Sequence, residues 1–416
     1  MFNKTASLFV LSLAAMGLAS CGGGDNADLT YWCPTGDNAV MTELVNRFKA
    51  SKAEYANLNI KLGANYGEGD TYAALHKDLD KAADVILMAD NNIRSGVLAE
   101  ELAEIKDDAY KATVSAEATE AMSVKGKVYG YAYRADNSPM PIYDSSLLGE
   151  ADVKNIETIL AKSKTAGKKV YLDFGNGWYN PFLLWCGGGD FRINDAGKLA
   201  TNVGGTGSAK AGVAKSLEAW KTLYNTYKDV FVSSSDSALI EAGFKAKTIS
   251  YAFLWNDMAN ITPNNADAKV ATWPSVTIDN KEVKMECFAS YKAVVCKENA
   301  NTERLTLAKA FASFISNKAS QELRLDQLGY GPSNLELLAS AKVAALPFVK
   351  KITEMQTELR THPQALSTTD DFWTPMANLG GLVIDGKAGW GDYASASKAL
   401  DALVSNTGWV VEELRK

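Results

Sequence analysis

Histidine and cysteine are scarce in this sequence, which limits the chemistry that it can support. The 416 residues include two histidines and five cysteines. His76 lies in a charged helical stretch and His362 stands beside Pro363 in an expected turn, so neither completes a Ser–His–Asp or Cys–His set. No C-x-x-C pair occurs, which argues against a zinc site. We therefore expect no metal ion, no cofactor and no enzymatic activity.

The sequence also lacks a long apolar run and a block of basic residues. Beyond the first 20 residues nothing approaches the ~20 apolar residues that a transmembrane helix needs. The formal net charge of −6 argues against a nucleic-acid partner. Four cysteines follow Cys21 and allow three disulfide pairings. Because each lies among apolar or strand-like residues, we expect all four to be free and buried. They are Cys33, Cys186, Cys287 and Cys296.

The first residues are typical of a secreted precursor. Lys4 supplies a positive charge, residues 8–18 form an apolar stretch, and small residues follow. This pattern indicates a signal peptide at residues 1–20. The Leu-Ala-Ser-Cys run that ends at Cys21 resembles a bacterial lipobox, which implies that the thiol of Cys21 carries a diacylglycerol. Residues 21–28 are expected to be a flexible linker. We therefore expect export, with a lipid anchor at the outer face of the cell membrane or in the periplasm.

The rest of the chain alternates short apolar segments with amphipathic ones, which predicts an α/β fold. Its length exceeds what one hydrophobic core usually supports, so we predict two lobes. Lobe 1 should comprise residues 29–137 and 288–332, and lobe 2 residues 138–287 and 333–416. Strands are expected at 29–32, 84–88, 128–133, 170–173, 249–253 and 287–295, and helices at 40–48, 213–227 and 305–315.

Several predicted strands end in loops that are rich in Asp, Asn and aromatic residues. In open α/β sheets, ligands bind outside the carboxyl ends of the strands, so we expect these loops to line one cleft. Carboxylates and amides hydrogen-bond to hydroxyl groups, and aromatic faces cover the C–H faces of a sugar ring. The combination favours a neutral polyol as ligand. The aromatic residues in such loops are Trp178, Tyr179, Trp255 and Trp373, whereas Trp185 and Trp220 have core-like surroundings.

The segments also follow the order of a known family, the extracellular solute-binding proteins of ABC importers, in the group that contains the maltose/maltodextrin-binding proteins. The resemblance is carried by LTYWCPTGDNAVMTELVNRF, ADVILMADNN, GKVYGYAYRADNSPMPIYDSSLL and EAGFKAKTISYAFLW. AKAFASFISNKASQELRLDQLGYGPSN is similar to the helix pair before the family's hinge turn. DDFWTPM resembles a late helix start that carries an aromatic stacking residue.

This resemblance implies a class II periplasmic binding protein fold, with two Rossmann-like α/β lobes joined by a multi-segment hinge. Two positions depart from the maltodextrin-binding pattern: Met88 replaces a common Trp, and Asn137 stands where a carboxylate is usual. Carried over by position, the ligand-binding residues would be Asp37, Asn38, Asn91, Asn92, Asp136, Asn137, Trp178, Tyr179, Trp255 and Trp373.

The resemblance further implies a monomeric, lipid-anchored receptor. It would capture a carbohydrate, expected to be an oligosaccharide, and deliver it to the transmembrane subunits of an ABC permease. Two alternatives remain open. One is a lipid-anchored glycoside hydrolase, for which Asp370 and Asp371 offer adjacent carboxylates. The other is a binder of a non-sugar solute such as a glycerol phosphate ester.

Overall fold

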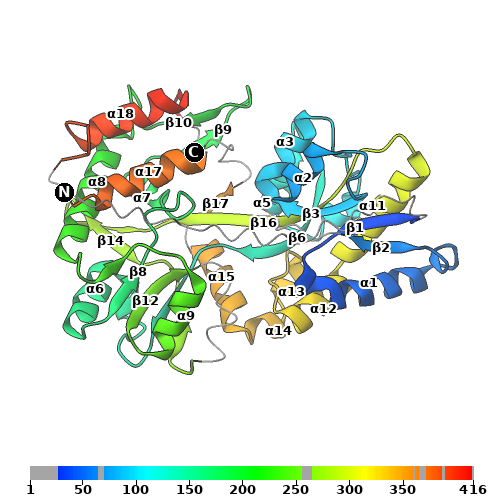
Figure 1. Ribbon diagram of the computed structural model, residues 1–416, viewed down its shortest axis with the longest axis horizontal. Helices are drawn as coiled ribbons and strands as arrows, with labels where there is room; N and C mark the ends of the chain where they lie inside the picture. The colour runs from blue at the N-terminus through cyan, green and yellow to red at the C-terminus, as the bar shows by residue number, and fades with distance from the viewer. Residues whose placement is uncertain are drawn as a thin grey trace, which may run out of the picture.

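Two β-sheets organise the chain into two bodies, which lie side by side in Figure 1. The first sheet has the strand order β17–β16–β3–β1–β2, with β6 also paired to β16, and the second has the order β11–β8–β12–β7–β13. We call the body around β1, β2, β3 and β6 lobe 1 and the body around the second sheet lobe 2. The computed structural model describes residues 27–63, 70–254, 265–358, 361–364, 372–386 and 389–414.

Lobe 1 packs its helices against a mixed sheet, in which β1, β2 and β3 are parallel and β16 runs antiparallel to β3 and β6. Strands β3, β6 and β16 are buried along their whole length, as expected where both faces of a sheet are covered. Helix α1 turns Val40, Leu44 and Phe48 into the core at helical spacing. The strands are β1 Leu29–Trp32, β2 Ile60–Gly63, β3 Val85–Ala89, β4 Ser123–Val124, β5 Lys127–Val128, β6 Gly130–Asn137 and β16 Cys287–Cys296, and the helices are α1 Asn38–Ser51, α2 Thr71–Lys77, α3 Ile93–Leu98, α4 Asp108–Lys111, α5 Ala116–Ala121, α11 Thr302–Ser316 and α12 Lys318–Leu328. Strand β17 (Thr361–Pro363) pairs with the first residues of β16, on the side of lobe 2.

Lobe 2 has a separate hydrophobic core that includes residues from the middle and the end of the chain. Trp220 and Trp185 are both buried there, which confirms the expectation that they are core residues. The strands are β7 Met140–Asp144, β8 Lys169–Tyr171, β9 Phe191–Ile193, β10 Leu199–Thr201, β11 Phe231–Val232, β12 Ile249–Leu254, β13 Ala268–Val270, β14 Ser275–Ile278, β15 Lys281–Lys284 and β18 Val410–Val411, and the helices are α6 Ile156–Thr165, α7 Phe182–Trp185, α8 Lys210–Thr226, α9 Ser237–Lys245, α17 Trp373–Ile384 and α18 Ala396–Thr407.

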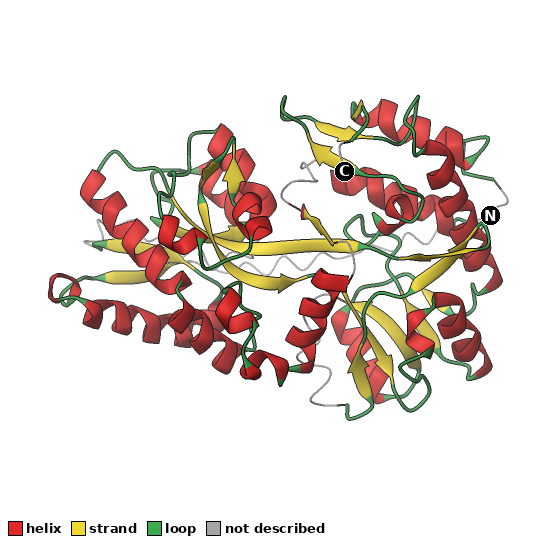
Figure 2. Ribbon diagram, turned by 180° about the vertical axis from the view of Figure 1, so that it is seen from behind, coloured by secondary structure: helices red, strands yellow, loops and turns green. Residues whose placement is uncertain are grey.

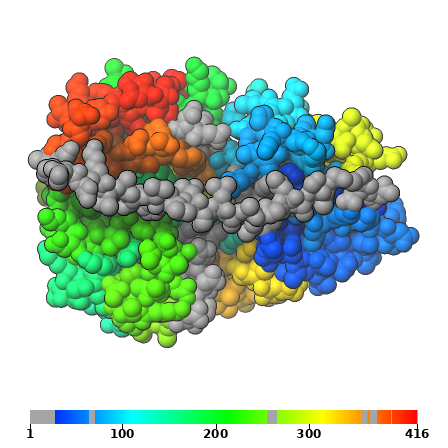
Figure 3. All heavy atoms as spheres, viewed as in Figure 1, coloured from blue at the N-terminus to red at the C-terminus, as the bar shows by residue number. Residues whose placement is uncertain are grey.

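Within its described residues, the chain passes between the lobes along three segments. Strand β6 leads into β7, β16 returns from lobe 2 to lobe 1, and α13 (Leu335–Leu338), α14 (Ala341–Ala344) and α15 (Pro347–Glu358) lead back towards lobe 2. Figure 2 shows the long strands reaching from one body to the other. In Figure 3 the orange and red C-terminal residues lie with the green residues of lobe 2. The return of the chain explains how distant segments share one lobe.

The predicted α/β fold and the strands and helices expected above are confirmed, but His362 lies elsewhere than predicted. It is in the short strand β17 rather than in a turn, because it pairs with Phe288 of β16. Its ring is buried and stacked on Trp185, with centroids 3.8 Å apart. Pro363 is tolerated because so short a strand requires few amide donors.

The expectations about the cysteines and about membrane-spanning helices can be compared with the described residues. Cys33, Cys186, Cys287 and Cys296 are free and buried there, as predicted. No helix among these residues combines the length and the apolar character that crossing a bilayer requires.

Candidate functional site

The carboxyl ends of strands from both lobes point towards the boundary between them. Strand β16 enters lobe 1 from lobe 2, and β3 and β6 run antiparallel to it, so both end on the side of lobe 2. Strand β1 is parallel to β3. In lobe 2, β7 begins at the boundary, β12 and β13 run antiparallel to it, and β8 is parallel to β12. The loops after these strands therefore begin near the boundary, where ligands of open α/β sheets bind.

Asp90 is the centre of a buried polar cluster at this boundary. It directly follows β3, and its carboxylate accepts hydrogen bonds from the hydroxyl of Ser290 (3.1 Å) and the backbone amides of Tyr291 and Asn91 (each 2.9 Å). Asn137, at the end of β6, donates from its amide nitrogen to the hydroxyl oxygen of Ser290 (3.1 Å). The cluster thus ties together the ends of β3 and β6 at the point where β16 crosses between the lobes.

Burial controls the charge of Asp90. It raises the pKa of this carboxyl group from 3.8 to about 6, although the amide of Tyr291 and the charge of Lys292 act in the opposite direction. Lys292, on the same crossing strand, is itself buried. Burial of Asp90 therefore makes its charged form less favourable at the boundary than it would be in water.

A second buried cluster links β6 and the loop after β1 to the turn after α12. Arg134 forms two hydrogen bonds with the carboxylate of Asp136, at 2.8 and 2.9 Å. Its guanidinium group lies over the ring of Tyr330, 3.5 Å from the centroid. The hydroxyl of Tyr330 donates to Asp37 Oδ1 (2.6 Å), and the amide of Gly331 donates to Asp136 Oδ2 (2.8 Å). Both carboxylates that were expected to contact a ligand are therefore engaged with the protein.

The expected ligand-binding residues differ widely in exposure. Asn38 is exposed, and Asn91 and Trp373 are partly exposed, so these three can meet a ligand without rearrangement. Trp255 lies outside the described residues, as do Cys21 and the pair Asp370 and Asp371. The buried members are Asp37, Asn92, Asp136, Asn137, Trp178 and Tyr179.

The aromatic residues expected in lobe 2 gather around Phe288 of the crossing strand. The ring centroid of Trp178 lies 6.4 Å from that of Phe288, and the ring centroid of Trp373 lies 5.9 Å from it. The indole nitrogen of Trp178 donates to Gln364 Oε1 (3.0 Å). Trp178 is 8% exposed and belongs to the core of lobe 2, which leaves Trp373 as the more accessible of the two rings.

A close backbone contact sets the position of Trp373. It begins α17, and a Cβ atom built on Gly177 would lie 2.0 Å from its carbonyl oxygen. Only glycine fits at position 177. In the same loop, Asn180 donates to the carbonyl oxygen of Phe174 (2.8 Å). It also donates to the carbonyl oxygen of Met376 (3.1 Å), which lies in α17. The loop 174–180 and the start of α17 are thus held together as one surface.

Two buried polar atoms near the hinge have no hydrogen-bond partner among the described residues. They are the amide oxygen of Asn137 and the hydroxyl of Ser138, in residues that are 1% and 0% exposed. Unpaired buried polar groups are uncommon in folded proteins and cost about 1–3 kcal/mol each. Their position next to the Asp90 cluster makes the end of β6 the polar centre of the boundary.

Sequence reasoning located the hinge turn that contains Tyr330 but missed three other residues that organise this boundary: Asp90, Arg134 and Ser290. A signal was available for Asp90, because it is a carboxylate directly after a fully apolar strand. Arg134 and Ser290 have no local signal. The contacts at the boundary join segments that lie far apart in the sequence, such as Tyr330 and Asp37.

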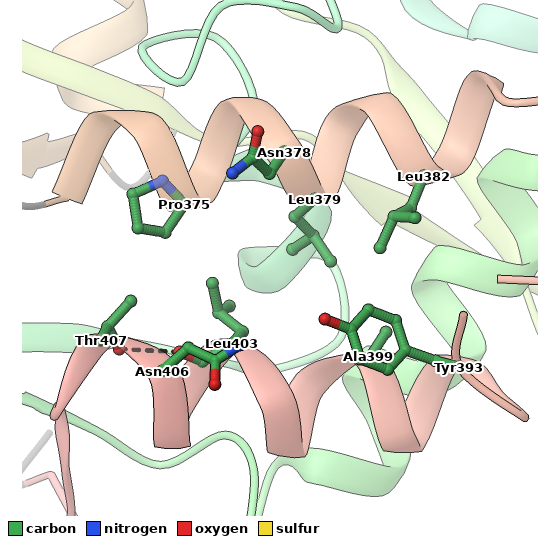
Figure 4. Close-up of a pocket in the computed structure, with 9 residues that line it drawn as sticks. All are labelled: Pro375, Asn378, Leu379, Leu382, Tyr393, Ala399, Leu403, Asn406 and Thr407. Atoms are coloured by element: carbon green, nitrogen blue, oxygen red, sulfur yellow. Dashed lines mark hydrogen bonds between the residues drawn. The ribbon is translucent and has the colours of Figure 1, made fainter. Parts of the chain in front are cut away.

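Cavities also occur away from these clusters. Figure 4 shows one of about 160 Å³ between α17 and α18, into which side chains of both helices point. It is lined by Pro375, Asn378, Leu379, Leu382, Tyr393, Ala399, Leu403, Asn406 and Thr407. A larger cavity of about 620 Å³ lies between α15 and the β13 edge of lobe 2, and Leu346, Phe348 and Val270 are among its lining residues.

The described side chains at the boundary can contact a ligand mainly through hydrogen bonds and aromatic rings. They contain no group of three or more His, Cys, Asp or Glu side chains placed to hold a metal ion. His362 Nε2 lies 2.5 Å from Glu286 Oε2 in lobe 2, so this histidine is engaged in a hydrogen bond with a carboxyl group. The arrangement at the boundary is suited to reversible binding of a polar solute.

Comparison of the sequence with protein families gives one match. The model of the bacterial extracellular solute-binding proteins matches residues 43–351. No curated protein matches the sequence.

Solved structures of similar shape cover nearly the whole chain. A maltodextrin-binding protein from L. casei BL23, solved without ligand, has a TM-score of 0.77 at 22% identity over 91% of this chain and 98% of its own. A cyclo/maltodextrin-binding protein with maltotetraose has a TM-score of 0.72 at 18% identity over 93% and 98%. The maltose-binding periplasmic protein from Listeria monocytogenes, with maltose, has a TM-score of 0.69 at 20% identity over 91% and 98%. At these identities the likeness shows the shared fold.

Proposed function

The chain belongs to the family of bacterial extracellular solute-binding proteins, and from this premise we propose that it captures a carbohydrate between its lobes for an ABC importer. The observation that carries the proposal is the direction of the strands. Six strand ends, three from each lobe, point at one boundary that combines amides, carboxylates and aromatic rings. The structures with maltotetraose and maltose lend support, because they share this fold over nearly their full length.

The accessible side chains at the boundary suit the hydroxyl and C–H groups of a sugar. Asn38 and Asn91 each present an amide that can both donate and accept hydrogen bonds. Trp373 presents an indole ring, which can cover the C–H face of a pyranose. We propose an oligosaccharide because structures of the same fold hold maltotetraose and maltose.

Hinge closure would complete the site. We propose that residues 29–137 and 288–332 move as one lobe and residues 138–287 and 333–416 as the other. Closure would bury the ligand's hydroxyl groups, which then need partners such as the side-chain amides of Asn38 and Asn91. A micromolar dissociation constant corresponds to about −8 kcal/mol, which permits release when the permease opens the lobes. No covalent step is needed.

A lipid anchor would keep this receptor beside its permease. We propose that residues 1–20 are removed and that Cys21 is acylated, so that a monomeric chain is held at the outer face of the membrane. The family is extracellular, which supports export. Residues 21–28 would serve as the tether.

Calorimetry with a panel of solutes tests the proposal. The panel contains maltose, maltotetraose and acarbose, several monosaccharides, glycerol 3-phosphate and a short peptide. We expect saturable binding of at least one sugar and no binding of the phosphate ester or the peptide. Tight binding of either of these, with every sugar inactive, would contradict the proposal. Chromatography of the same samples after prolonged incubation should recover the sugar unchanged, whereas sustained release of shorter sugars would indicate a hydrolase.

A further inference from the structure

Tyr330 lies in a turn that is fixed to the end of β6. Helix α12 ends at Leu328, and Gly329 follows in the left-handed conformation, with a φ of 70°. The amide of Gly331 donates to Asp136 Oδ2 (2.8 Å), and the amide of Ala135 donates to the carbonyl oxygen of Gly331 (3.2 Å). These two bonds place Tyr330 beside the last residues of β6, where the chain crosses to lobe 2.

The side chain of Tyr330 is held at both ends. Its hydroxyl donates to Asp37 Oδ1 (2.6 Å), and the guanidinium group of Arg134 covers its ring at 3.5 Å from the centroid. Arg134 is in turn fixed by its paired hydrogen bonds to Asp136. The ring therefore loses its rotational freedom before any ligand arrives, and a contact with it costs little further entropy.

Exposure distinguishes Tyr330 from the carboxylate beneath it. Asp37 is 0% exposed, whereas Tyr330 remains partly exposed although a cation covers its ring. A solute that reaches this part of lobe 1 would therefore meet the ring of Tyr330 before the carboxylate of Asp37. The hydrogen bond to Tyr330 gives Asp37 a supporting role.

We propose that Tyr330 is an aromatic platform of lobe 1 on which a sugar ring stacks, with Asp37 and Arg134 as the residues that position it. This inference rests on the proposed carbohydrate binding. A phenol ring with an exposed part offers the electron-rich surface that aliphatic C–H groups of a pyranose favour. It also supplies an aromatic contact in lobe 1, where Met88 at the end of β3 provides none. The ligand would thus lie between Tyr330 of lobe 1 and Trp373 of lobe 2.

Two variants of the full chain separate the ring from its hydroxyl group. Tyr330→Phe keeps the ring and loses the bond to Asp37, and Tyr330→Leu removes the ring but keeps an apolar side chain. Calorimetry with the best-binding sugar of the panel, maltotetraose in the first instance, should give an affinity within about threefold of the unsubstituted chain for Tyr330→Phe and at least about tenfold weaker for Tyr330→Leu.

The control is Tyr55, another tyrosine of lobe 1 that is partly exposed with a cation over its ring. Lys52 lies 5.0 Å from its ring centroid, and its ring stacks on Phe48. Tyr55 precedes β2, away from the boundary clusters, so Tyr55→Leu should leave the affinity unchanged. A fall in affinity equal to that of Tyr330→Leu would show a general effect on lobe 1 and overturn the inference.

A spectroscopic measurement makes the test independent of whether Tyr330→Leu folds. In the unsubstituted chain with labelled tyrosine, nuclear Overhauser contacts should join ring protons of one tyrosine to C–H protons of the sugar, and Tyr330→Phe should remove those contacts. Their absence while the sugar binds, or equal losses of affinity in the Phe and Leu variants, would overturn the inference and leave carbohydrate binding intact. If the unsubstituted chain binds no sugar of the panel, both proposals fail.

Discussion

Replacing Asp90 with asparagine should change how the free energy of unfolding depends on pH. Burial holds the pKa of Asp90 at about 6, compared with an ordinary value of 3.8. Each pKa unit corresponds to about 1.4 kcal/mol, so the ionised carboxylate costs the folded chain about 3 kcal/mol relative to the protonated one. This is a large share of the stability of a typical domain.

The sign of the effect follows from proton binding. Between the two pKa values the folded chain binds more protons than the unfolded chain, so the contribution of Asp90 to the free energy of unfolding falls as the pH rises through this window. The Asp90→Asn variant cannot titrate there. The free energy of unfolding of the original chain minus that of the variant should therefore be greater at about pH 4 than at about pH 7, by about 2 kcal/mol.

Urea unfolding followed by circular dichroism, across this pH range, measures the difference. Taking the difference removes the opposing contribution of other carboxyl groups. One of these is Asp84: burial raises its pKa, but hydrogen bonds from Arg304 and Thr30 outweigh this and hold the pKa below the ordinary value. As a control, Asp108→Asn alters an exposed carboxylate paired with Lys111 and should show no rise towards acid pH. If the difference in free energy of unfolding between the original chain and Asp90→Asn does not change with pH, the inference that a titrating carboxylate is buried at the hinge is refuted.

Three further predictions concern other parts of the chain. Arg304→Met leaves the buried carboxylate of Asp84 without its two guanidinium hydrogen bonds (2.6 and 2.7 Å) and should lower the free energy of unfolding by about 3 kcal/mol. Arg47→Ala, which breaks an exposed ion pair, should lower it by less than about 1 kcal/mol. Equal losses for the two variants in urea unfolding would contradict this prediction. Gly177→Ala must displace the backbone of Trp373 and should destabilise the chain by about 1–3 kcal/mol. Gly381→Ala lies in α17 with open space around it and should stabilise the chain by about 0.5–1 kcal/mol. Cys21→Ser should release the chain from the membrane fraction and Cys186→Ala should not, as judged by immunoblotting of fractionated cells; a Cys21→Ser chain that stays in the membrane fraction would refute the lipid anchor.

Local patterns in the sequence were sufficient for the longer strands and for three of the longer helices. The apolar run at residues 84–88 became β3, and the helical spacing of Val40, Leu44 and Phe48 became the buried face of α1. These signals depend on neighbours within a few residues, so no knowledge of the fold is needed to read them. The two-lobed α/β architecture followed from the alternation of such segments over a long chain.

The boundary between the lobes was less predictable because its contacts join distant segments. Asp37 is expected to contact a ligand from its loop, and nothing local shows that its side chain is buried against Tyr330, a residue 293 positions away. Trp178 lies in a loop as expected, but nothing local shows that its ring lies 6.4 Å from that of Phe288 in β16. His362 looked like a turn residue because Pro363 follows it, yet pairing with β16 draws both into a strand. For His362, tertiary contacts outweighed the local pattern.

The most direct test of carbohydrate capture is a crystal structure of the full chain grown with maltotetraose, or with whichever panel sugar binds most tightly. We expect electron density for the sugar at the boundary between the lobes, with one ring against Tyr330, another against Trp373, and hydrogen bonds to Asn38 or Asn91. Density confined to another place, such as the cavity between α17 and α18, would contradict the account.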